Sequence, residues 1–499
     1  MTTPLARLSY GFAKDKGVVL MTGQSGAAVL GVRRGADPLA VLEARRVAGC
    51  RVHVEGLDGA SFDRRLSEIY ASTGIDAAGL DDAVDGEGDL DSLAAGLTET
   101  ADLLDTSDDA PVIRLINGLI SEAVRTRASD IHIEPFEDRL SVRLRVDGVM
   151  REVLTPPRKV APLLVSRIKV MARLDIAEKR VPQDGRVSLS LGGRSIDVRV
   201  STLPSRYGER VVMRLLDKEQ AHLDLDQLGM PAKTLDRFRQ ALKAPNGIVL
   251  VTGPTGSGKT TTLYAALTLL NDQVRNILTV EDPIEYGLDG VGQTQVNARV
   301  GMTFAAGLRA ILRQDPDIVM VGEIRDAETA QIAVQASLTG HLVLSTVHTN
   351  SAAAAVTRLR DMGVEPFLLS STLSAVMAQR LVRRLCPSCK TPYTPGAREL
   401  ALLGLPPGGD HTFYHAVGCE ACGGLGYEGR IGLYELIVMD QTLREMIHED
   451  AREHTIEAHA LGETETLRAS GARHVVEGVT TAEEVLRVVR QSGDADGGV

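Results

Sequence analysis

Residues 253–261, GPTGSGKTT, have the composition and spacing of a loop that binds nucleotide phosphates. They follow an apolar run, GIVLVT, and precede a helical pattern, TTLYAAL, which is the setting that such a loop requires. Glycines let backbone N–H groups close around phosphate oxygens, and the N-terminus of the next helix adds partial positive charge. We expect Lys259 to contact the β- and γ-phosphates and Thr260 to bind Mg²⁺. The residues predicted to bind ATP are Gly253, Pro254, Thr255, Gly256, Ser257, Gly258, Lys259, Thr260 and Thr261.

Two glutamates stand at the ends of apolar runs that have the character of buried strands. Glu281 ends the run NILTVE, and Glu323 follows IVMVG. An ordinary ATPase of this class has an aspartate at the second position to hold magnesium, whereas this chain has Gly322 there. We expect Glu323 to hold magnesium and order water, and Glu281 to polarise the attacking water. The sequence also allows the reverse assignment.

Five arginines are candidates to stabilise the negative charge that develops during phosphoryl transfer. An arginine supplied by a neighbouring subunit or domain can raise the rate by roughly 10³–10⁵. Arg309 and Arg313 are four residues apart, which predicts that they share one helix face, and Arg325 follows the strand that carries Glu323. These three positions suit subunit contacts. Arg199 and Arg214 lie in an Arg-rich region before the loop, each among alternating strand residues.

Two histidines flank another apolar run, HLVLSTVH. His348 stands at the carboxyl end of this predicted strand, the edge where ligands bind in parallel sheets. We expect it to sense the γ-phosphate. His341 stands at the start of the same strand and is either a second catalytic candidate or a support for the strand.

Four of the five cysteines form two close pairs, Cys386/Cys389 and Cys419/Cys422, and Cys50 stands alone. The spacing C-x₂-C-x₂₉-C-x₂-C predicts a structural zinc site with four thiolate ligands. A redox CxxC motif is the alternative, but two pairs in one insert favour zinc. Zinc binding would contribute on the order of 10 kcal/mol to folding a segment with little core of its own.

The elements that position these residues follow from hydrophobic periodicity. Short apolar runs alternate with helical patterns from GIVLVTG to HLVLSTV, which predicts an α/β fold with a parallel, doubly wound sheet. Before it, Leu140, Val142 and Leu144 alternate with Ser141 and Arg143, as in a half-buried strand of an α+β domain. We expect these segments: an N-terminal domain (1–75), an acidic linker (76–111), an Arg-rich α+β domain (112–235), an ATPase core (236–385), a tetracysteine segment (386–430) and a helical C-terminal part (431–499).

Composition and charge fit a globular protein of several domains. The chain has 499 residues, 43% hydrophobic and 24% charged, and no apolar run approaches the ~18 residues that span a bilayer. Its start lacks a secretory signal, so we expect a cytoplasmic location. One segment accounts for the net charge of −11, because residues 66–113 hold thirteen of the 66 acids and none of the 55 bases.

The order of motifs resembles one known family from about residue 110 to the end. The segments GPTGSGKTTTLYAAL, TVEDPIEY, LRQDPDIVMVGEIRDAETA, TGHLVLSTVHTN and the cysteine pairs are similar to secretion ATPases of the type II system, the GspE family. ASDIHIEP and RVPQDGRVSLSLGGRSIDVRVSTLP resemble the domain that precedes the core in this family. The resemblance names four motifs: the phosphate loop (253–260), the aspartate box (279–285), the Walker B strand (318–323) and the histidine box (340–348).

The resemblance implies a RecA-like P-loop core after a PAS-like α+β domain, assembled as a homo-hexamer that hydrolyses ATP. Such a motor drives pseudopilus assembly and export of folded proteins across the outer membrane. It implies that Arg199 and Arg214 contact the γ-phosphate and that Arg309, Arg313 and Arg325 lie near subunit boundaries. The implied partners are the cytoplasmic part of a bitopic inner-membrane protein (GspL-like), bound by the N-terminal domain, a platform protein (GspF-like) and acidic phospholipids. The implied location is the cytoplasm, peripherally bound to the inner membrane.

Other functions share part of this pattern. A type IV pilus assembly ATPase has the same core and usually the same cysteine pairs, but tends to have a longer N-terminal region. Pilus retraction ATPases typically lack the cysteines. A nucleic-acid motor is disfavoured because the chain has no Trp, only 3% aromatic residues and no basic, aromatic-lined track, so no nucleic acid is expected as partner. A nucleotide-gated scaffold without hydrolysis is the remaining alternative.

Overall fold

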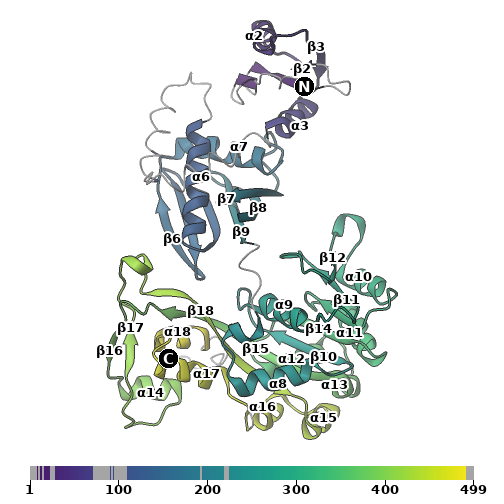
Figure 1. The fold of residues 1–499 in the computed structure, drawn as a ribbon, viewed down its shortest axis with the longest axis vertical. Coiled ribbons are helices and arrows are strands. Elements are labelled where there is room, and N and C mark those ends of the chain that lie inside the picture. Colours follow the sequence, from purple (N-terminus) through teal and green to yellow (C-terminus); the bar gives the residue numbers. More distant parts are fainter. Residues whose placement is uncertain are drawn as a thin grey trace. The chain divides into compact units, whose positions relative to one another are not determined.

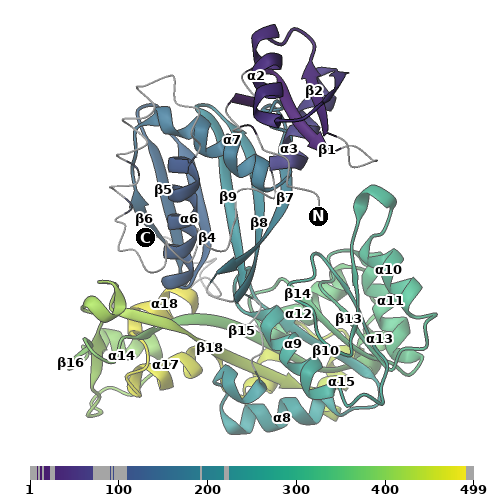
Figure 2. The same ribbon diagram turned by 45° about the horizontal axis from the view of Figure 1, so that its top comes forward.

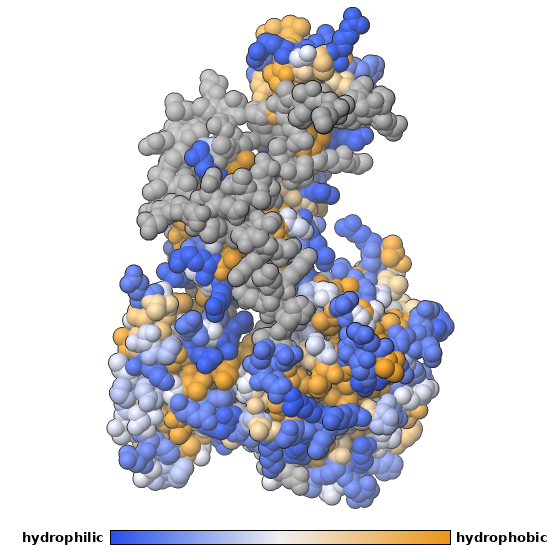
Figure 3. Space-filling view, in the orientation of Figure 1, coloured by the Kyte–Doolittle hydropathy of each residue, from blue (hydrophilic) through white to orange (hydrophobic). Residues whose placement is uncertain are grey.

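A computed structural model describes residues 16–22, 28–70, 110–191, 194–217, 224–462 and 464–489, with single positions at 8, 12, 13, 90 and 94. The chain divides into two compact units, Met1–Glu219 and Gln220–Val499. Most of the predicted acidic linker lies outside the described residues. No helix in the described ranges is both long and apolar enough to span a membrane. On the face drawn in Figure 3, hydrophobic side chains form separate patches among hydrophilic ones.

The N-terminal part of the first unit is a small α/β layer. Its sheet has the order β1-β2-β3, in which β1 and β2 are antiparallel and β2 and β3 are parallel. Apolar residues of both strands and helices, among them Val19, Leu30 and Phe62, form its core. Its elements are β1 (Val18–Thr22), β2 (Ala28–Arg33), α2 (Pro38–Ala48), β3 (His53–Leu57) and α3 (Gly59–Tyr70).

The Arg-rich part of the first unit is an antiparallel sheet with the strand order β6-β5-β4-β9-β8-β7, accompanied by helices α6 and α7 (Figures 1 and 2). Paired positions in neighbouring strands carry the same kind of side chain, such as Ile131, Leu144 and Met213 on one face. Charged residues occupy the other face, as the alternating pattern predicts. The elements are α6 (Ala110–Arg125), β4 (Ala128–Pro135), β5 (Leu140–Val146), β6 (Val149–Leu154), η1 (Arg158–Val160), α7 (Ala161–Met171), β7 (Gln183–Leu191), β8 (Arg194–Ser205) and β9 (Gly208–Asp217).

The second unit contains the predicted α/β core. Its central sheet has the order β12-β11-β13-β14-β10-β15-β18, and every neighbouring pair is parallel except β15 and β18. Fully buried runs such as IVMV of β13 explain why the sequence shows continuous rather than alternating apolar residues. The strands are β10 (Gly247–Thr252), β11 (Ile277–Glu281), β12 (Gly292–Gln295), β13 (Ile318–Val321), β14 (Leu342–Val347), β15 (Leu373–Leu385) and β18 (Tyr427–Val438).

Helices cover both faces of this sheet (Figure 1). On one face α8 and α9 share a core with Val249 and Val251 of β10, and on the other Ile248 and Leu250 pack with α10 to α13 and the C-terminal helices. The helices are η2 (Leu225–Leu228), α8 (Ala232–Leu242), α9 (Lys259–Leu270), η3 (Ala298–Val300), α10 (Phe304–Ile311), α11 (Ala327–Leu338), α12 (Ala352–Asp361), α13 (Pro366–Thr372), α15 (Gln441–His448), α16 (Glu453–Leu461), α17 (Leu467–Val476) and α18 (Ala482–Val489).

The tetracysteine segment leaves the sheet between β15 and β18. It contains β16 (Thr391–Tyr393), which pairs with β17 (Phe413–His415), and also α14 (Ala397–Leu403) and η4 (Glu420–Cys422). The second unit begins at Gln220, and η2 and α8 pack in its core. The sequence prediction began the ATPase core at residue 236, within α8. The domain ranges themselves stay predictions.

Candidate active site

The phosphate loop joins β10 to α9 in a conformation that only glycine fits. Gly253, Gly256 and Gly258 have φ values of 150°, 80° and 85°. A Cβ atom at Gly253 would lie 2.5 Å from the backbone oxygen of Gln379, and one at Gly258 would lie 2.8 Å from the side-chain Nε2 of the same residue. The loop is therefore bounded by β15 on one side and keeps its backbone N–H groups exposed to a ligand rather than to side chains.

Lys259, the first residue of α9, folds back over the loop. Its Nζ donates hydrogen bonds to the carbonyl oxygens of Gly253, at 2.8 Å, and Pro254, at 3.1 Å. Burial lowers the pKa of Lys259 to about 8, an effect that the nearby Glu323 charge opposes and the Arg380 charge supports. Anionic phosphates would restore the preference for the charged form and take the place of the two carbonyls.

Glu323 contacts Arg325 and His348 near the loop. Its side chain is about 10% exposed, with Oε1 2.5 Å from Nη2 of Arg325 and Oε2 3.3 Å from Nε2 of His348. Burial, together with the Lys259 charge, lowers the pKa of His348, so its ring is neutral near pH 7 and Nε2–H donates to Glu323. Three predicted residues, Glu323, Arg325 and His348, thus lie together with electrostatic contact to Lys259.

Glu281 belongs to a different cluster. Its carboxylate, 2% exposed, accepts hydrogen bonds from the hydroxyl of Tyr264, from Thr279 Oγ1 at 2.6 Å and from Gln293 Nε2 at 3.0 Å. Burial and the neighbouring Glu281 raise the pKa of Tyr264 well above its usual range, so the hydroxyl is a permanent donor. Within the described residues, these three donors account for the hydrogen bonds of the carboxylate, and Lys259 and Glu323 are not among them. A carboxylate can accept about four hydrogen bonds, so a water molecule can be added to these three donors.

Two polar residues of β15, Gln379 and Arg380, border the loop and were not predicted. Thr262 Oγ1 of α9 donates to Gln379 Oε1 at 2.7 Å, and Arg380 Nη2 donates to the backbone oxygen of Asn350 at 2.8 Å. Both side chains are at least 97% buried, and burial lowers the pKa of Arg380, against the opposing effect of Glu435. A glutamine and an arginine inside the apolar run AVMAQRLV were the signal that could have found them.

Arg309 lies near the end of α10, and Arg313 follows the helix. Helix α10 ends at Ile311, so Arg313 is in the turn after it and does not share a helix face with Arg309 as expected. Arg313 Nη1 donates to the backbone oxygen of Arg309 at 2.9 Å, and Arg309 forms an exposed ion pair with Glu328. Their predicted role at a subunit boundary stays a prediction.

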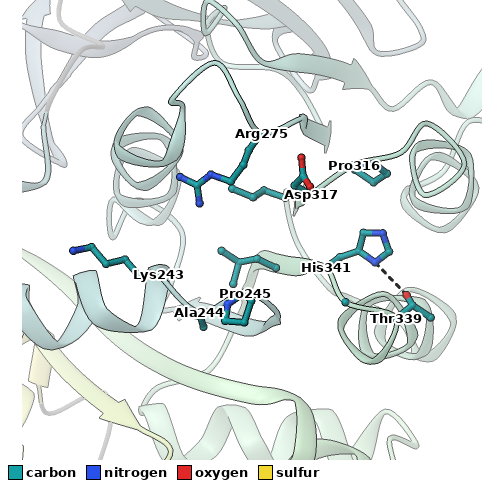
Figure 4. Close-up of a pocket in the computed structure, with 11 residues that line it drawn as sticks. Lys243, Ala244, Pro245, Arg275, Pro316, Asp317, Thr339 and His341 are labelled. Carbon is teal, nitrogen blue, oxygen red and sulfur yellow. Dashed lines mark hydrogen bonds between the residues drawn. The ribbon is translucent and has the colours of Figure 1, made fainter.

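His341 precedes β14 and lies at the opposite edge of the sheet from the loop, because β10 and β14 run parallel and Thr252 pairs with Val347. Its Nδ1 donates to the backbone oxygen of Ala336 at 2.8 Å. There it lines a pocket of about 340 Å³ with Lys243, Arg275, Asp317 and Thr339 (Figure 4). Support for the strand and turn is the role that this contact favours.

Arg199 and Arg214 belong to the first unit, where they face each other directly on β8 and β9. Arg214 Nε lies 2.9 Å from Oδ1 of Asp130. Two guanidinium groups at opposed positions of a sheet repel each other, and Asp130 supplies the opposite charge to Arg214. Their contact with the γ-phosphate stays a prediction.

The four paired cysteines come together as their spacing predicts. Their sulfur atoms all lie within 4.8 Å of one another, with 3.9 Å between Cys386 and Cys419 and 3.8 Å between Cys419 and Cys422. Four ligands at a Zn–S distance of about 2.3 Å lie about 3.8 Å apart in a tetrahedron. Backbone N–H groups of Cys419 and Gly426 donate to Cys422 Sγ, the kind of contact that supports a metal-bound thiolate. The cluster fits a tetrahedral metal ion.

Two family models match the chain. Residues 105–487 match the model described as Type II/IV secretion system protein, and residues 7–70 match a model of the N-terminal domain of GSPII protein E. The second match covers the N-terminal α/β layer, for which the sequence motifs gave little indication.

Named relatives and one solved structure extend these matches. The chain is 58% identical to type II secretion system protein E of Pseudomonas aeruginosa over 488 residues, 98% of this chain and 97% of the relative. It is also 58% identical to type II secretion system ATPase E of Vibrio cholerae over 454 residues, 91% and 90% of the two chains. The crystal structure of the pilus retraction motor PilT with bound ADP superposes with a TM-score of 0.51 at 26% identity, covering 76% of this chain and 96% of that one.

Proposed function

The chain belongs to the type II/IV secretion system protein family, and we propose that it hydrolyses ATP as the motor of a type II secretion system. The observation that carries the proposal is the cluster of Lys259, Glu323 and His348 beside a glycine-bounded phosphate loop. The identity of 58% over nearly the whole length to proteins named type II secretion system protein E favours secretion over pilus assembly. The coupled work is assembly of a pseudopilus and export of folded proteins.

In this proposal the loop and its lysine bind the phosphates. Lys259 leaves the carbonyls of Gly253 and Pro254 and turns to β- and γ-phosphate oxygens. Thr260 and Glu323 would hold magnesium, which would supply positive charge beside those oxygens. Gln379 supports the loop through Thr262 from the adjacent strand.

The hydrolytic step uses the two glutamates and the preceding domain. Glu323 would order water beside a bound magnesium ion, and Glu281 accepts a proton from the attacking water. His348 senses the γ-phosphate and, through its Nε2 contact, couples the presence of this phosphate to Glu323. Arg199 and Arg214 stabilise charge that develops on the γ-phosphate when the Arg-rich domain closes on the core. Closure in each subunit of a homo-hexamer is the mechanical stroke, with Arg309, Arg313 and Arg325 near the subunit boundaries.

The tetracysteine cluster holds zinc in a structural role. Four thiolates leave no open position for water or substrate. The N-terminal domain binds the cytoplasmic part of a bitopic inner-membrane protein, and the ring acts on an inner-membrane platform protein. The motor is cytoplasmic and peripherally bound to the inner membrane, where acidic phospholipids are a further contact.

The test uses the full-length protein with the purified cytoplasmic part of its membrane partner. Wild-type protein should release phosphate from ATP, Lys259→Ala should bind and hydrolyse none, and Arg199→Ala should keep nucleotide binding while losing turnover. Turnover no higher than that of Lys259→Ala would leave only the scaffold alternative. Unchanged turnover of Arg199→Ala would remove the closing domain from the chemistry.

A further inference from the structure

Strand β4 carries a buried acid that the proposed chemistry does not use. Asp130 is 4% exposed, and its Oδ1 accepts the Nε–H of Arg214 at 2.9 Å. Its Oδ2 accepts the hydroxyl hydrogen of Ser129 at 2.7 Å and lies 3.7 Å from Nε of Arg145. Both carboxylate oxygens are therefore committed, and the side chain cannot turn away without losing several contacts.

The arginine that Asp130 holds is only partly engaged. Within the part of the chain that the structure describes, the contacts of Arg214 all use Nε, which leaves the two terminal nitrogens for another acceptor. The side chain is 57% exposed. A guanidinium anchored at Nε presents its two Nη groups as a fork, the geometry that suits phosphate oxygens.

The pairing of the strands places further arginines beside Arg214 across the sheet. Asp130 pairs with Arg214, Arg214 with Arg199 and Arg199 with Arg186 on β4, β9, β8 and β7. Like charges at directly opposed positions of a sheet repel each other, so the orientation of Arg214 depends on the acid that it contacts. Asp130 also pairs with Arg145 on β5, so it lies between two arginines of this row and supplies the opposite charge to Arg214.

We propose that Asp130 is a positioning residue that holds the Arg214 guanidinium in the orientation in which it meets the γ-phosphate. The inference rests on the proposed function, because it requires Arg214 to act on the nucleotide. A free arginine side chain must lose rotamer freedom to reach the charge that develops in the transition state, and the ion pair with Asp130 imposes part of that order in advance. Asp130 thus acts on the rate of hydrolysis through Arg214 and not on the affinity for ATP.

The same strand supplies a matched control. Glu134 lies four residues further along β4, on the same face, and is 6% exposed. It forms ion pairs with Arg210, at 2.6 Å, and with Arg143, neither of which stands in the row with Arg214. Glu134→Gln therefore removes a buried charge from the same strand without touching Arg214.

The experiment measures kcat and KM for ATP, nucleotide binding and Tm for the full-length protein with its partner's cytoplasmic part. We expect Asp130→Asn to lower kcat about tenfold with KM within about twofold, and Arg214→Ala to lower kcat about 100-fold or more. The double variant should match Arg214→Ala, because Asp130 has nothing left to position. Glu134→Gln should keep kcat within about twofold even if its Tm falls as far as that of Asp130→Asn.

Other outcomes of this experiment would contradict the proposed role of Asp130 or of Arg214. If Arg214→Ala loses turnover but Asp130→Asn behaves like Glu134→Gln, Asp130 only stabilises the fold and the proposed function stands. If the double variant is slower than Arg214→Ala, Asp130 acts independently of Arg214, and the inference is wrong. If Arg214→Ala keeps full turnover, the proposed role of Arg214 fails and the inference falls with it. Should Asp130→Asn not fold, Asp130→Glu, which keeps the charge but shifts the carboxylate, must show reduced kcat at unchanged KM.

Discussion

The hydroxyl of Tyr264 donates a hydrogen bond to the buried carboxylate of Glu281, so the helix after the phosphate loop and the end of β11 share one network. The backbone N–H of Glu285 donates to the same hydroxyl at 3.3 Å, which adds the turn after β11. A movement of α9 that displaced Tyr264 would change the hydrogen bonds of Glu281. This is a physical route by which an occupied loop can release or orient the acid.

Removal of this hydroxyl should change turnover more than nucleotide affinity. In Tyr264→Phe the ring keeps its packing, but Glu281 loses one of three donors and its orientation is less well defined. We expect kcat to fall about five- to tenfold with KM for ATP within about twofold, since a small misplacement of a reacting group is costly. Tyr286→Phe is the control, because it removes a neighbouring hydroxyl and keeps the edge-on contact of the two rings, at 4.5 Å between centroids. Equal kcat for both variants would show that the Tyr264 hydroxyl is only structural.

Substitution of Glu323 and substitution of Glu281 should have different effects on the Mg²⁺ requirement for ATP hydrolysis. Glu323→Gln removes the charge beside Lys259 and His348, so we expect turnover to fall about 10²–10³-fold and the Mg²⁺ concentration for half-maximal activity to rise. Glu281→Gln should lower turnover by a similar factor at unchanged Mg²⁺ requirement, because Glu281 lies in the separate Tyr264 network. Titration of phosphate release with Mg²⁺ checks both. Wild-type turnover of Glu281→Gln would exclude Glu281 from the chemistry, and an unchanged Mg²⁺ requirement of Glu323→Gln would exclude Glu323 as metal ligand.

Zinc should be present in equal amount to the chain and should depend on the four paired cysteines alone. We expect Cys419→Ser to lose bound zinc and to expose the cysteine-bearing turns of residues 386–430 to proteolysis, because the metal would be what joins these turns. Elemental analysis and limited proteolysis measure the two effects. Cys50→Ser is the control, since Cys50 is exposed and lies in the first unit. Full zinc content in Cys419→Ser, or its loss in Cys50→Ser, would contradict the assignment.

Motifs with local geometry were predictable from the sequence. The loop around Lys259 needs only a strand, glycines and a helix in order, and the cysteine cluster needs only two CxxC pairs on facing turns. The α/β core followed from continuous apolar runs, and the Arg-rich sheet from alternation such as that of Leu144 with Arg143 and Arg145. In the loop and the strands the residues that decide the structure are neighbours in the chain, and within each cysteine pair the two ligands are three positions apart.

Contacts between distant segments were not predictable. Thr262 meets Gln379 across 117 positions, and Arg214 meets Asp130 across 84. A tyrosine in an apolar helix has the pattern of a core residue, so nothing in the sequence marked the Tyr264 hydroxyl as a partner of Glu281. Arg313 was misplaced for another reason: α10 ends at Ile311, before the end that its apolar pattern indicates.

Glu484 of α18 should stabilise the second unit in a pH-dependent way. Its buried carboxylate accepts hydrogen bonds from Arg383 Nη2, at 2.7 Å, and Arg487 Nη2, at 3.1 Å. Burial raises its pKa, but these arginines outweigh burial and hold the pKa of Glu484 at about 2, against 4.5 in a free side chain. A lowered pKa means that the folded state favours the charged form. The contribution, about 3 kcal/mol by this difference, is therefore fully present above pH about 4.5 and is lost as pH falls towards 2.

Glu484→Gln should accordingly lower the free energy of unfolding by about 2–3 kcal/mol at pH 7, with the deficit constant down to about pH 5 and shrinking below about pH 4.5. Urea unfolding followed by circular dichroism between about pH 3 and 7 measures this difference. Glu483→Gln is the control, because its neighbouring carboxylate is exposed and should leave stability within about 0.5 kcal/mol at every pH. A deficit of Glu484→Gln that stays the same at the acid end of this range would mean that packing, and not the charge facing Arg383, is what Glu484 contributes. A deficit equal to that of Glu483→Gln would mean that the ion pair adds nothing to the docking of α18 on β15.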